Sequence, residues 1–366
     1  MINLTPLTYT HPLYDHIVGT GGIGSGLFFL LEGNQTLTRN ESRLGRQLTC
    51  RDYCKQHTIL HYVSVLMGAV SGAFEVYPIG KVGDDDRGWG LLAEMDSVGM
   101  ITRGVTATND AATLFSVCFQ YPDSTGGNIT TSNGASCLLT AGDIANFLKT
   151  LKLPGKGMAL AVPEVPLEAR IALLMEGRKR GWFNAASLSA NEATGFVALG
   201  GLELSDLLSM NKDEAAAMTG VDAEATDTVD IVQYCREMLV QHNPAALLIV
   251  TDGPRGSWAC SGGKRAFVPP LAVVPSSTAG AGDALFAGTL AGLACGLPFI
   301  KDTRDSRFSE TPLDSAVELG TLLASLTITS PDTIHWGADA LTLREHAATH
   351  GVRFSERFSA MFPSQS

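Results

Sequence analysis

The sequence predicts an α/β protein with a mostly parallel central sheet and helices on both of its faces, and three observations support this. From residue 166 onward, stretches with helical spacing of apolar residues alternate with short apolar runs typical of buried strands. Such alternation favours β–α–β units. Hydrophobic residues form 45% of the 366-residue chain and charged residues 17%, so a large core is expected. The 39 glycines are typical of the tight turns that these folds need.

The first half of the chain predicts more strands than the second half. An apolar strand, a glycine turn and a second apolar strand are expected within residues 13–32, and the alternating residues 35–39 predict the return strand of a hairpin. A helix is expected over 45–70 and another over 88–100, with strands over 73–80 and 113–121. This excess of strands indicates a small β element beside the main sheet.

The second half predicts the regular alternation. The expected helices are 166–180, 229–241 and 283–295, and the expected strands are 182–187 and 246–253. We expect one main domain over 13–340. A short helix at 341–350 and a polar end would then form a peripheral C-terminal tail over 341–366.

Charge and cysteine usage restrict the classes of partner. The formal net charge of −11 argues against nucleic acid and anionic membranes as partners. The seven cysteines are odd in number and form no C-x-x-C pair, which favours reduced thiols over a disulfide framework. The N-terminus lacks the basic and apolar regions of a signal peptide, and no apolar run reaches about 20 residues. We therefore expect a cytoplasmic protein.

The strongest chemical signal is the run Ser277-Thr-Ala-Gly-Ala-Gly-Asp283, which leads directly into a predicted helix. Free backbone N–H groups and the positive end of the helix dipole would form an anion site there. Asp283 would lie at its mouth, where it is a poor phosphate ligand but a good general base for an attacking hydroxyl. The plain alternative is an ordinary aspartate in the first turn of a helix.

At these residues the chain resembles the PfkB, or ribokinase-like, family of carbohydrate and nucleoside kinases. Further stretches match in order, and each is short. They are the glycine- and aspartate-rich turn at 79–100, Phe-Asn-Ala-Ala-Ser at 183–187, an N-x-x-E motif at 211–214 and a T-x-G-x-x-G turn at 251–256. The resemblance covers roughly residues 75–330. It implies a three-layer α/β/α sandwich with a small β lid, and transfer of the γ-phosphoryl group of ATP to a hydroxyl of a small sugar-like metabolite.

The resemblance also implies roles for single residues. Asp283 corresponds to the catalytic base, and the backbone of Gly280, Ala281 and Gly282 corresponds to the anion hole. Asn211 and Glu214 would orient Mg²⁺ and its waters, which suits a hard ion that keeps several waters. A helix cap made by the same two residues is the alternative, and both roles can hold together.

For the nucleotide, the resemblance implies contacts from Thr251, Gly253, Gly256, Asn184 and Asn211, and a plain hairpin turn is the alternative for 251–256. Segments 268–278 and 322–330 would flank the adenine. Segments 27–39 and 113–121 would form a lid that excludes water from the reaction. Lids in this family often pair two subunits, so a homodimer through the lid is a further expectation.

The chain departs from the family pattern at three places. Ser277 stands where an aspartate is usual, which puts a monovalent-cation site in doubt. Asn184 also replaces a common aspartate, and the family's early G-G-x-x-x-N sugar motif is missing. Arginines 43, 46 and 51 in that region could recognise an anionic acceptor, although a solvated basic helix face is the simpler interpretation.

Two other function classes remain open from the sequence. A non-catalytic family member that binds a nucleotide or metabolite as a sensor would fit the loss of the sugar motif. Separately, Gly19-Thr-Gly-Gly-Ile-Gly24 fits the G-x-G-x-x-G fingerprint of NAD(P)-binding oxidoreductases. That fingerprint needs a helix directly after it. The residues after Gly24 are strand-like instead.

Overall fold

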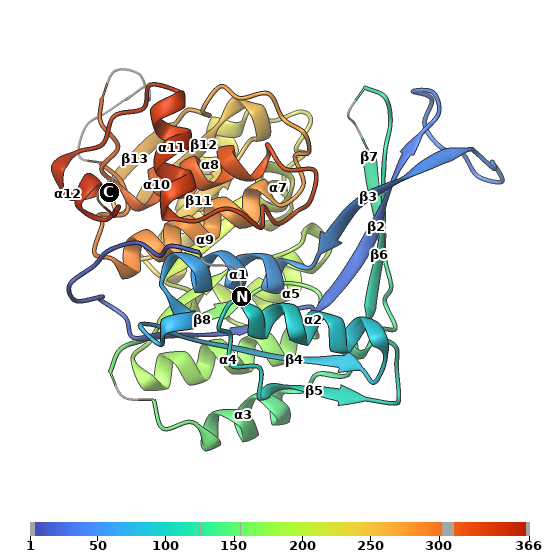
Figure 1. Cartoon of the computed structure of the whole chain (residues 1–366), viewed down its shortest axis with the longest axis horizontal. Coiled ribbons are helices and arrows are strands. Elements are labelled where there is room, and N and C mark those ends of the chain that lie inside the picture. The colour runs from blue at the N-terminus through green and yellow to red at the C-terminus, as the bar shows by residue number, and fades with distance from the viewer. Residues whose placement is uncertain (1–3, 124–125, 154, 302–310, 364–366) are drawn as a thin grey trace.

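The structure is a computed structural model, and it describes residues 4–363 except 124–125, 154 and 302–310. Its body has three layers, with a large sheet between two layers of helices (Figure 1). A smaller sheet projects from one side of this body. The predicted α/β architecture is therefore confirmed. In the described part of the chain, no helix has both the length and the apolar character needed to cross a bilayer.

The large sheet has nine strands in the order β13-β12-β11-β10-β9-β8-β1-β4-β5. All neighbouring strands from β11 to β5 pair in parallel, whereas β12 and β13 pair antiparallel at one edge. The strands are β1 (His16–Thr20), β4 (Glu75–Gly83), β5 (Gly104–Thr108), β8 (Gly157–Ala161), β9 (Phe183–Ala186), β10 (Leu207–Asn211), β11 (Leu247–Thr251), β12 (Ser257–Ser261) and β13 (Lys264–Val268).

Helices cover both faces of this sheet because side chains along each strand alternate between two separate cores. In β10, for example, Leu207 belongs to the core on one face and Leu208 to the core on the other. The first face is covered by α1 (Lys55–Leu66), α2 (Asp86–Ser97), α9 (Ala281–Ala294), α10 (Ala316–Thr327), α11 (Ala340–Thr349) and α12 (Glu356–Ala360). The second face is covered by α3 (Ala141–Thr150), α4 (Leu167–Arg180), α5 (Ala193–Ala198), α6 (Gly201–Leu204), α7 (Lys212–Thr219) and α8 (Thr228–His242).

Helices α9 and α10 pack unusually closely. Glycines on both helices allow this approach. A Cβ atom added at Gly288 would lie only 2.7 Å from the Cα of Gly320 on α10. A Cβ atom at Gly320 would in turn lie 2.2 Å from the carbonyl oxygen of Leu285. This contact therefore fixes the position of α9, whose N-terminus carries Asp283, against the body of the protein.

The smaller sheet has four strands in the order β3-β2-β6-β7, with bounds β2 (Gly24–Leu31), β3 (Gly45–Tyr53), β6 (Leu114–Gln120) and β7 (Gly126–Thr130). Figure 1 shows it standing beside the main body, at the end of the large sheet where α1 and α7 begin. Strand β2 follows β1 after three residues, and β3 leads into α1, so the two sheets are joined by short connections.

Two expectations for the first half of the chain were wrong. Residues 45–53 form β3 rather than the start of a helix, so α1 begins at Lys55. Residues 35–39 lie in the loop between β2 and β3 and form no strand, so β3 is the true return strand of the hairpin. The polar sequence of β3 explains the error, because most of its side chains are exposed and show little alternation.

The C-terminal segment 341–366 was expected to be a peripheral tail, but its described part, residues 341–363, contributes to the main core. Phe358 is fully buried, and Leu343 and Ala347 of α11 pack in the same core as α9 and α10. The N-terminal segment joins the same region, since the backbone N–H of Thr5 donates to the Asp339 carboxylate at 2.9 Å.

Candidate active site

Three neighbouring parallel strands bring polar side chains together at their carboxyl ends. Strands β10 and β11 end in register, with Asn211 opposite Thr251. Ser187 directly follows β9, the neighbour of β10 on the other side. In open parallel sheets this edge is where ligands bind. The sequence placed Thr251 and Asn211 at a site, and the structure brings both to this edge.

The N-terminus of α9 approaches the same edge. Gly280 caps this helix with a φ of 78°, and a Cβ atom there would lie 2.3 Å from the carbonyl oxygen of Thr333. Only glycine fits both constraints. The backbone amides of Ala281, Gly282 and Asp283 follow in the first turn, where helix geometry leaves N–H groups without partners inside the helix. Asp283 therefore lies in the first turn of a helix whose N-terminus has the features expected of an anion site.

One pocket joins these elements. It is lined by residues of α1, of the strand ends, of α7 and of α9, namely Lys55, Ser187, Ser209, Met210, Asn211, Glu214, Thr251, Gly282, Asp283 and Phe286. It encloses about 60 Å³. Clefts that hold small-molecule ligands usually measure ~300–1,000 Å³. The pocket by itself is therefore smaller than the clefts that usually hold such ligands.

Asp283 has the electrostatics of a base. Burial raises the pKa of its carboxyl group to about 6, Lys55 opposes this shift, and the charges of Glu214 and Asp52 add to it. A carboxylate with a pKa near neutrality remains ionised at pH 7 and still accepts a proton more readily than an exposed aspartate. Asp283 is therefore chemically suited to general-base catalysis.

Lys55 is the basic residue of the pocket lining, and the sequence did not reveal its role. Its Nζ lies 3.1 Å from Oε1 of Glu214, with Asp283 and Glu164 as further sources of attraction. These carboxylates raise the pKa of Lys55 against the opposing effect of burial. Lys55 follows strand β3 of the small sheet by two residues, so it links the small sheet to the pocket.

Glu164 is, after Lys55, a second residue whose role the sequence did not reveal. It follows β8 in a loop with a φ of 77°, and its Oε2 accepts a hydrogen bond from the backbone N–H of Lys55 at 3.3 Å. Burial raises the pKa of Glu164 to about 7. A left-handed backbone at a non-glycine residue is uncommon and concentrates at functional sites.

Asn211 and Glu214 form a reciprocal helix cap at the start of α7. The side chain of Asn211 accepts from the backbone N–H of Glu214 at 2.8 Å, and Oε2 of Glu214 accepts from the backbone N–H of Asn211 at 2.8 Å. The other Glu214 oxygen pairs with Lys55. Among the described residues no group of three or more His, Cys, Asp or Glu is arranged to hold a metal directly. The donor set suits a Mg²⁺ ion that keeps most of its waters.

Thr251 lines the pocket, but the turn that follows β11 contributes no lining residue. Gly253 and Gly256 have φ angles of 53° and 104°, and Asp252 between β11 and this turn pairs with Arg255 and accepts from Thr228. The two segments expected to flank adenine contact each other, since the backbone N–H of Ser276 donates to the carbonyl oxygen of Ile328 at 2.7 Å.

The PfkB family carbohydrate kinase model matches residues 63–340, which is well over half of the chain. The chain is a member of the PfkB family. It is therefore a kinase, as the motifs predicted. The matched region contains Asp283, Asn211, Glu214 and the turn at 251–256, whereas Lys55 and the strands β2 and β3 precede it.

Solved structures of related kinases show the same fold. A Burkholderia thailandensis nucleoside kinase in complex with inosine superposes with a TM-score of 0.69 at 17% identity, covering 92% of this chain and 99% of that one. A ribokinase from Cryptococcus neoformans in complex with ADP gives a TM-score of 0.66 at 15% identity, covering 90% and 99%. The ribokinase-like fold of this PfkB kinase is thereby established.

Sequence relatives match over shorter stretches. A Klebsiella pneumoniae fructokinase is 38% identical over 98 residues, which is 26% of this chain and 29% of the relative. A probable fructokinase-7 from Arabidopsis thaliana is 32% identical over 104 residues, or 28% and 29%. The matches thus span less than a third of each relative.

Asn184 of this PfkB kinase does not lie at the site. It is fully buried near the start of β9, whereas the pocket lies beyond the end of that strand. Its side-chain amide donates to the carbonyl oxygens of Leu174 at 2.7 Å and Leu204 at 2.8 Å. The expected nucleotide contact by Asn184 is corrected accordingly, and Ser187 is the residue of this segment that lines the pocket.

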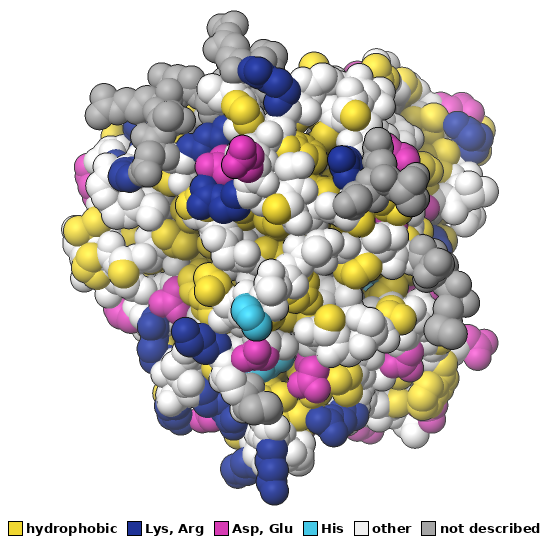
Figure 2. Space-filling view, turned by 60° about the vertical axis from the view of Figure 1, so that its left-hand side comes forward, with side chains coloured by type: hydrophobic (Ala, Val, Ile, Leu, Met, Phe, Trp, Pro, Cys, Tyr) yellow, Lys and Arg dark blue, Asp and Glu magenta, His cyan; other side chains and the backbone are white. Residues whose placement is uncertain are grey.

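The three arginines of the PfkB kinase's N-terminal region lie outside the pocket. They belong to β3 and the loop before it, so they form no helix face. Arg43 pairs with Glu41, and Arg51 pairs with Glu94 at 2.5 Å. The face in Figure 2 likewise shows basic and acidic side chains near one another rather than segregated.

The glycine run at 19–24 has a structural role in this PfkB kinase. It is followed by β2 rather than by a helix, so the dinucleotide fingerprint lacks its structural context. A Cβ atom at Gly24 would lie 2.5 Å from the carbonyl oxygen of Leu114, and one at Gly22 would lie 2.5 Å from the Cβ of Glu164. These glycines let β2 pair with β6 and let Glu164 approach the pocket.

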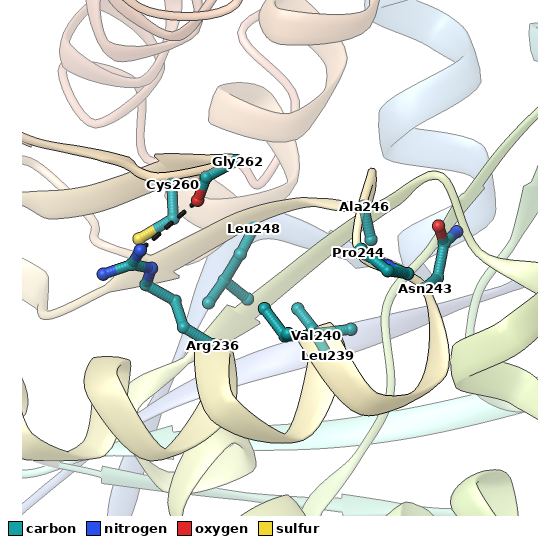
Figure 3. A pocket seen from close by; sticks show the side chains of 9 residues that line it. All are labelled: Arg236, Leu239, Val240, Asn243, Pro244, Ala246, Leu248, Cys260 and Gly262. Atoms are coloured by element: carbon teal, nitrogen blue, oxygen red, sulfur yellow. Dashed lines mark hydrogen bonds between the residues drawn. The ribbon is translucent and has the colours of Figure 1, made fainter.

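A different pocket lies between α8 and strands β11 and β12 and shares no lining residue with the pocket of Asp283 (Figure 3). It encloses about 10 Å³ and is lined mainly by aliphatic side chains such as Leu239, Val240 and Leu248. Arg236 points across one end and donates to the carbonyl oxygen of Gly262 at 3.3 Å. This space admits at most about one water molecule and carries no chemistry.

Proposed function

We propose that this PfkB kinase transfers the γ-phosphoryl group of ATP to a hydroxyl group of a small, neutral, sugar-like metabolite, with Asp283 as the general base. The observation that carries the proposal is the location of the Asp283 carboxylate. It lies at the N-terminus of α9, in one pocket with Lys55 and Glu214, and its pKa is raised to about 6.

Asp283 takes the proton of the acceptor hydroxyl as the oxygen attacks phosphorus. A positioned base of this kind contributes about 10²–10⁴-fold to the rate. The backbone amides of Gly280, Ala281 and Gly282 stabilise negative charge on the transferred group, because they are held by the helix and need no reorganisation.

Glu214 and Asn211 hold Mg²⁺ through its water shell, and Mg²⁺ supplies charge neutralisation for the phosphates when bound. Both residues also cap α7, so the helix cap and the metal role coincide. Thr251 and the turn with Gly253 and Gly256 line the path of the triphosphate. Segments 268–278 and 322–330 enclose the adenine. Potassium activation is not expected, because Ser277 replaces the usual aspartate.

The acceptor is a neutral polyol rather than an anion. The groups that surround Asp283 on the side of the small sheet are acidic. Oδ2 of Asp52 accepts from Ser116 at 2.5 Å, and Glu164 faces Lys55. Carboxylates are strong acceptors for sugar hydroxyls but repel a sugar acid or a sugar phosphate. Of the three arginines that could have recognised an anion, Arg43 pairs with Glu41 and Arg51 pairs with Glu94.

The small sheet is the lid of this site and excludes water when the acceptor binds. Its projection from the body leaves room for the lid of a second copy, which supports a homodimer through the lid. All seven cysteines are free thiols, which supports the expected cytoplasmic location.

A coupled ADP-release assay over neutral sugars, nucleosides, sugar acids and sugar phosphates tests the proposal. We expect acceptor-dependent ADP formation in the first two classes and loss of it in Asp283→Asn. Binding of ATP and a metabolite without turnover across the whole panel would instead support the non-catalytic alternative.

A further inference from the structure

Lys55 occupies an unusual place for a cation. It is the first residue of α1, where the positive end of the helix dipole disfavours a positive charge. No acidic residue in the first turn of α1 offsets this effect. The compensation comes from other elements, since Glu214, Asp283 and Glu164 all attract the ammonium group. A lysine that depends on three carboxylates from distant parts of the chain indicates a role in the pocket.

The ion pair with Glu214 matters because both oxygens of Glu214 are engaged. Oε2 accepts from the backbone N–H of Asn211, and this bond maintains the cap of α7. Oε1 is the oxygen that a divalent ion or its water shell could use, and it pairs with Lys55 at 3.1 Å. Two cations cannot share one carboxylate oxygen at such a distance without strong repulsion.

We propose that Lys55 and the divalent metal ion compete for Oε1 of Glu214, and that the displaced ammonium group of Lys55 then binds the transferred phosphoryl group. The first half concerns the chain and a metal ion alone. The second half rests on the proposed kinase function.

The position of Lys55 explains why its ammonium group, once displaced from Glu214, would reach the phosphoryl group. Lys55 lines the same small pocket as Gly282 and Asp283, at the N-terminus of α9. When Lys55 leaves Glu214, the nearest developing negative charge is that of the group held by these amides. Lysine carries a compact charge on a flexible stem, so it can move between the two partners. In the absence of nucleotide the same ion pair would weaken metal binding.

Binding of Mn²⁺, measured by electron paramagnetic resonance without nucleotide, tests the first half. Lys55→Met removes the ammonium and keeps the length of the side chain. We expect about 10-fold tighter Mn²⁺ binding in Lys55→Met, because the competitor is gone. Lys55→Arg keeps a competing cation and should bind Mn²⁺ as weakly as the wild type. Unchanged or weaker Mn²⁺ binding in Lys55→Met would overturn the competition.

Lys212→Met is the matched control for charge. Lys212 lies on α7 two residues before Glu214, and it lines a different pocket with Asp227 and Asp252. Its removal changes the net charge by the same amount and leaves the Lys55–Glu214 pair intact. An equal gain in Mn²⁺ affinity in Lys212→Met would show a general charge effect and overturn the specific competition.

A measurement on the wild-type protein covers the case in which Lys55→Met does not fold. Reductive methylation of Lys55, followed by mass spectrometry, reports how freely its Nζ reacts. We expect faster methylation of Lys55 when Mn²⁺ is added, because the ion pair with Glu214 is broken. An unchanged rate at saturating Mn²⁺ would overturn the displacement.

Kinetics test the second half. With an acceptor that supports turnover, Lys55→Met should lower kcat about 100-fold or more with a smaller change in the KM for ATP. A normal kcat would overturn the phosphoryl contact. Failure of the proposed function would appear as absence of ADP formation with every acceptor. The Mn²⁺ and methylation experiments need no turnover, so their results would still test the competition.

Discussion

Asn211 and Glu214 each accept a hydrogen bond from the other's backbone N–H at 2.8 Å, so two residues proposed to orient a metal ion also begin helix α7. The structural and the chemical role of this motif can be separated by substitution. A glutamine at 214 keeps an oxygen that can accept from Asn211, whereas an alanine does not.

Glu214→Gln should therefore raise the Mg²⁺ concentration needed for half-maximal activity while changing the melting temperature little. Glu214→Ala should lose the cap as well and cost about 1 kcal/mol of unfolding free energy. A Mg²⁺ titration of activity together with thermal unfolding checks both. An unchanged Mg²⁺ requirement in Glu214→Gln would argue against the metal role.

Asp283→Asn should abolish phosphoryl transfer, with a loss of at least about 10³-fold, and should largely spare ATP binding. The amide cannot accept the proton of the acceptor hydroxyl, but it preserves shape. Isothermal calorimetry with ATP and the ADP-release assay separate binding from turnover. Asp213→Asn is the control, because Asp213 is an exposed aspartate in the first turn of α7. Comparable turnover in Asp283→Asn and Asp213→Asn would refute the base assignment.

The raised pKa of Asp283 also predicts a dependence of stability on pH. Burial penalises the ionised form in the folded protein. The free energy of unfolding of the wild-type protein is therefore highest, as far as Asp283 is concerned, below the pKa of an unfolded aspartate. It falls as the pH rises through about 6. Asp283→Asn lacks this penalty, so it should be more stable than the wild type by about 1–2 kcal/mol at pH 7.5 and equal to it near pH 4. Urea unfolding at both pH values checks this, and a constant difference would contradict it.

The same pKa predicts the acid limb of the activity profile. Asp283 must be ionised to accept a proton, so kcat should fall as the pH drops below about 6. Glu164, with a pKa raised to about 7, titrates in the same range. Glu164→Gln removes this second group, and the limb that persists in Glu164→Gln belongs to Asp283. Disappearance of the limb in Glu164→Gln would assign it to Glu164 instead.

Asn184→Ala should destabilise the protein by about 2–3 kcal/mol, because the carbonyl oxygens of Leu174 and Leu204 would lose their buried donor. The KM for ATP should remain within about twofold of the wild-type value, since this side chain is remote from the pocket. Denaturant unfolding and steady-state kinetics check the two parts. A large rise in KM without destabilisation would restore the nucleotide role that the sequence suggested.

The sequence was most informative where one physical pattern dominates. Apolar strands such as β11 predicted the parallel sheet, because strands covered by helices on both faces need apolar side chains on both sides. It was least informative at β3, a largely exposed strand of the small sheet whose polar residues show no clear period. The segment with Asn184 was recognised as a strand, but which of its residues lies beyond the strand end depends on a boundary that propensity does not define.

Lys55 and Glu164 show a different limit. Lys55 is the first residue of α1 and Glu164 lies in the loop after β8, and neither belongs to a motif that the sequence displays. Their importance arises only when α1, β8, α7 and α9 converge, because the charges that surround Lys55 come from residues more than 100 positions away in the chain. Long-range convergence of this kind leaves no local signal.

The glycine contact between α9 and α10 has a consequence for how the kinase tolerates change. Asp283 lies about 7–8 Å along the helix axis from Gly288, so both residues move with the same helix. A methyl group added at Gly320 would push α9 outward. The Asp283 carboxylate would then move away from the transferred phosphoryl group, although no pocket residue had changed. Variants far from the chemistry could thus silence the enzyme by misaligning it while leaving it folded.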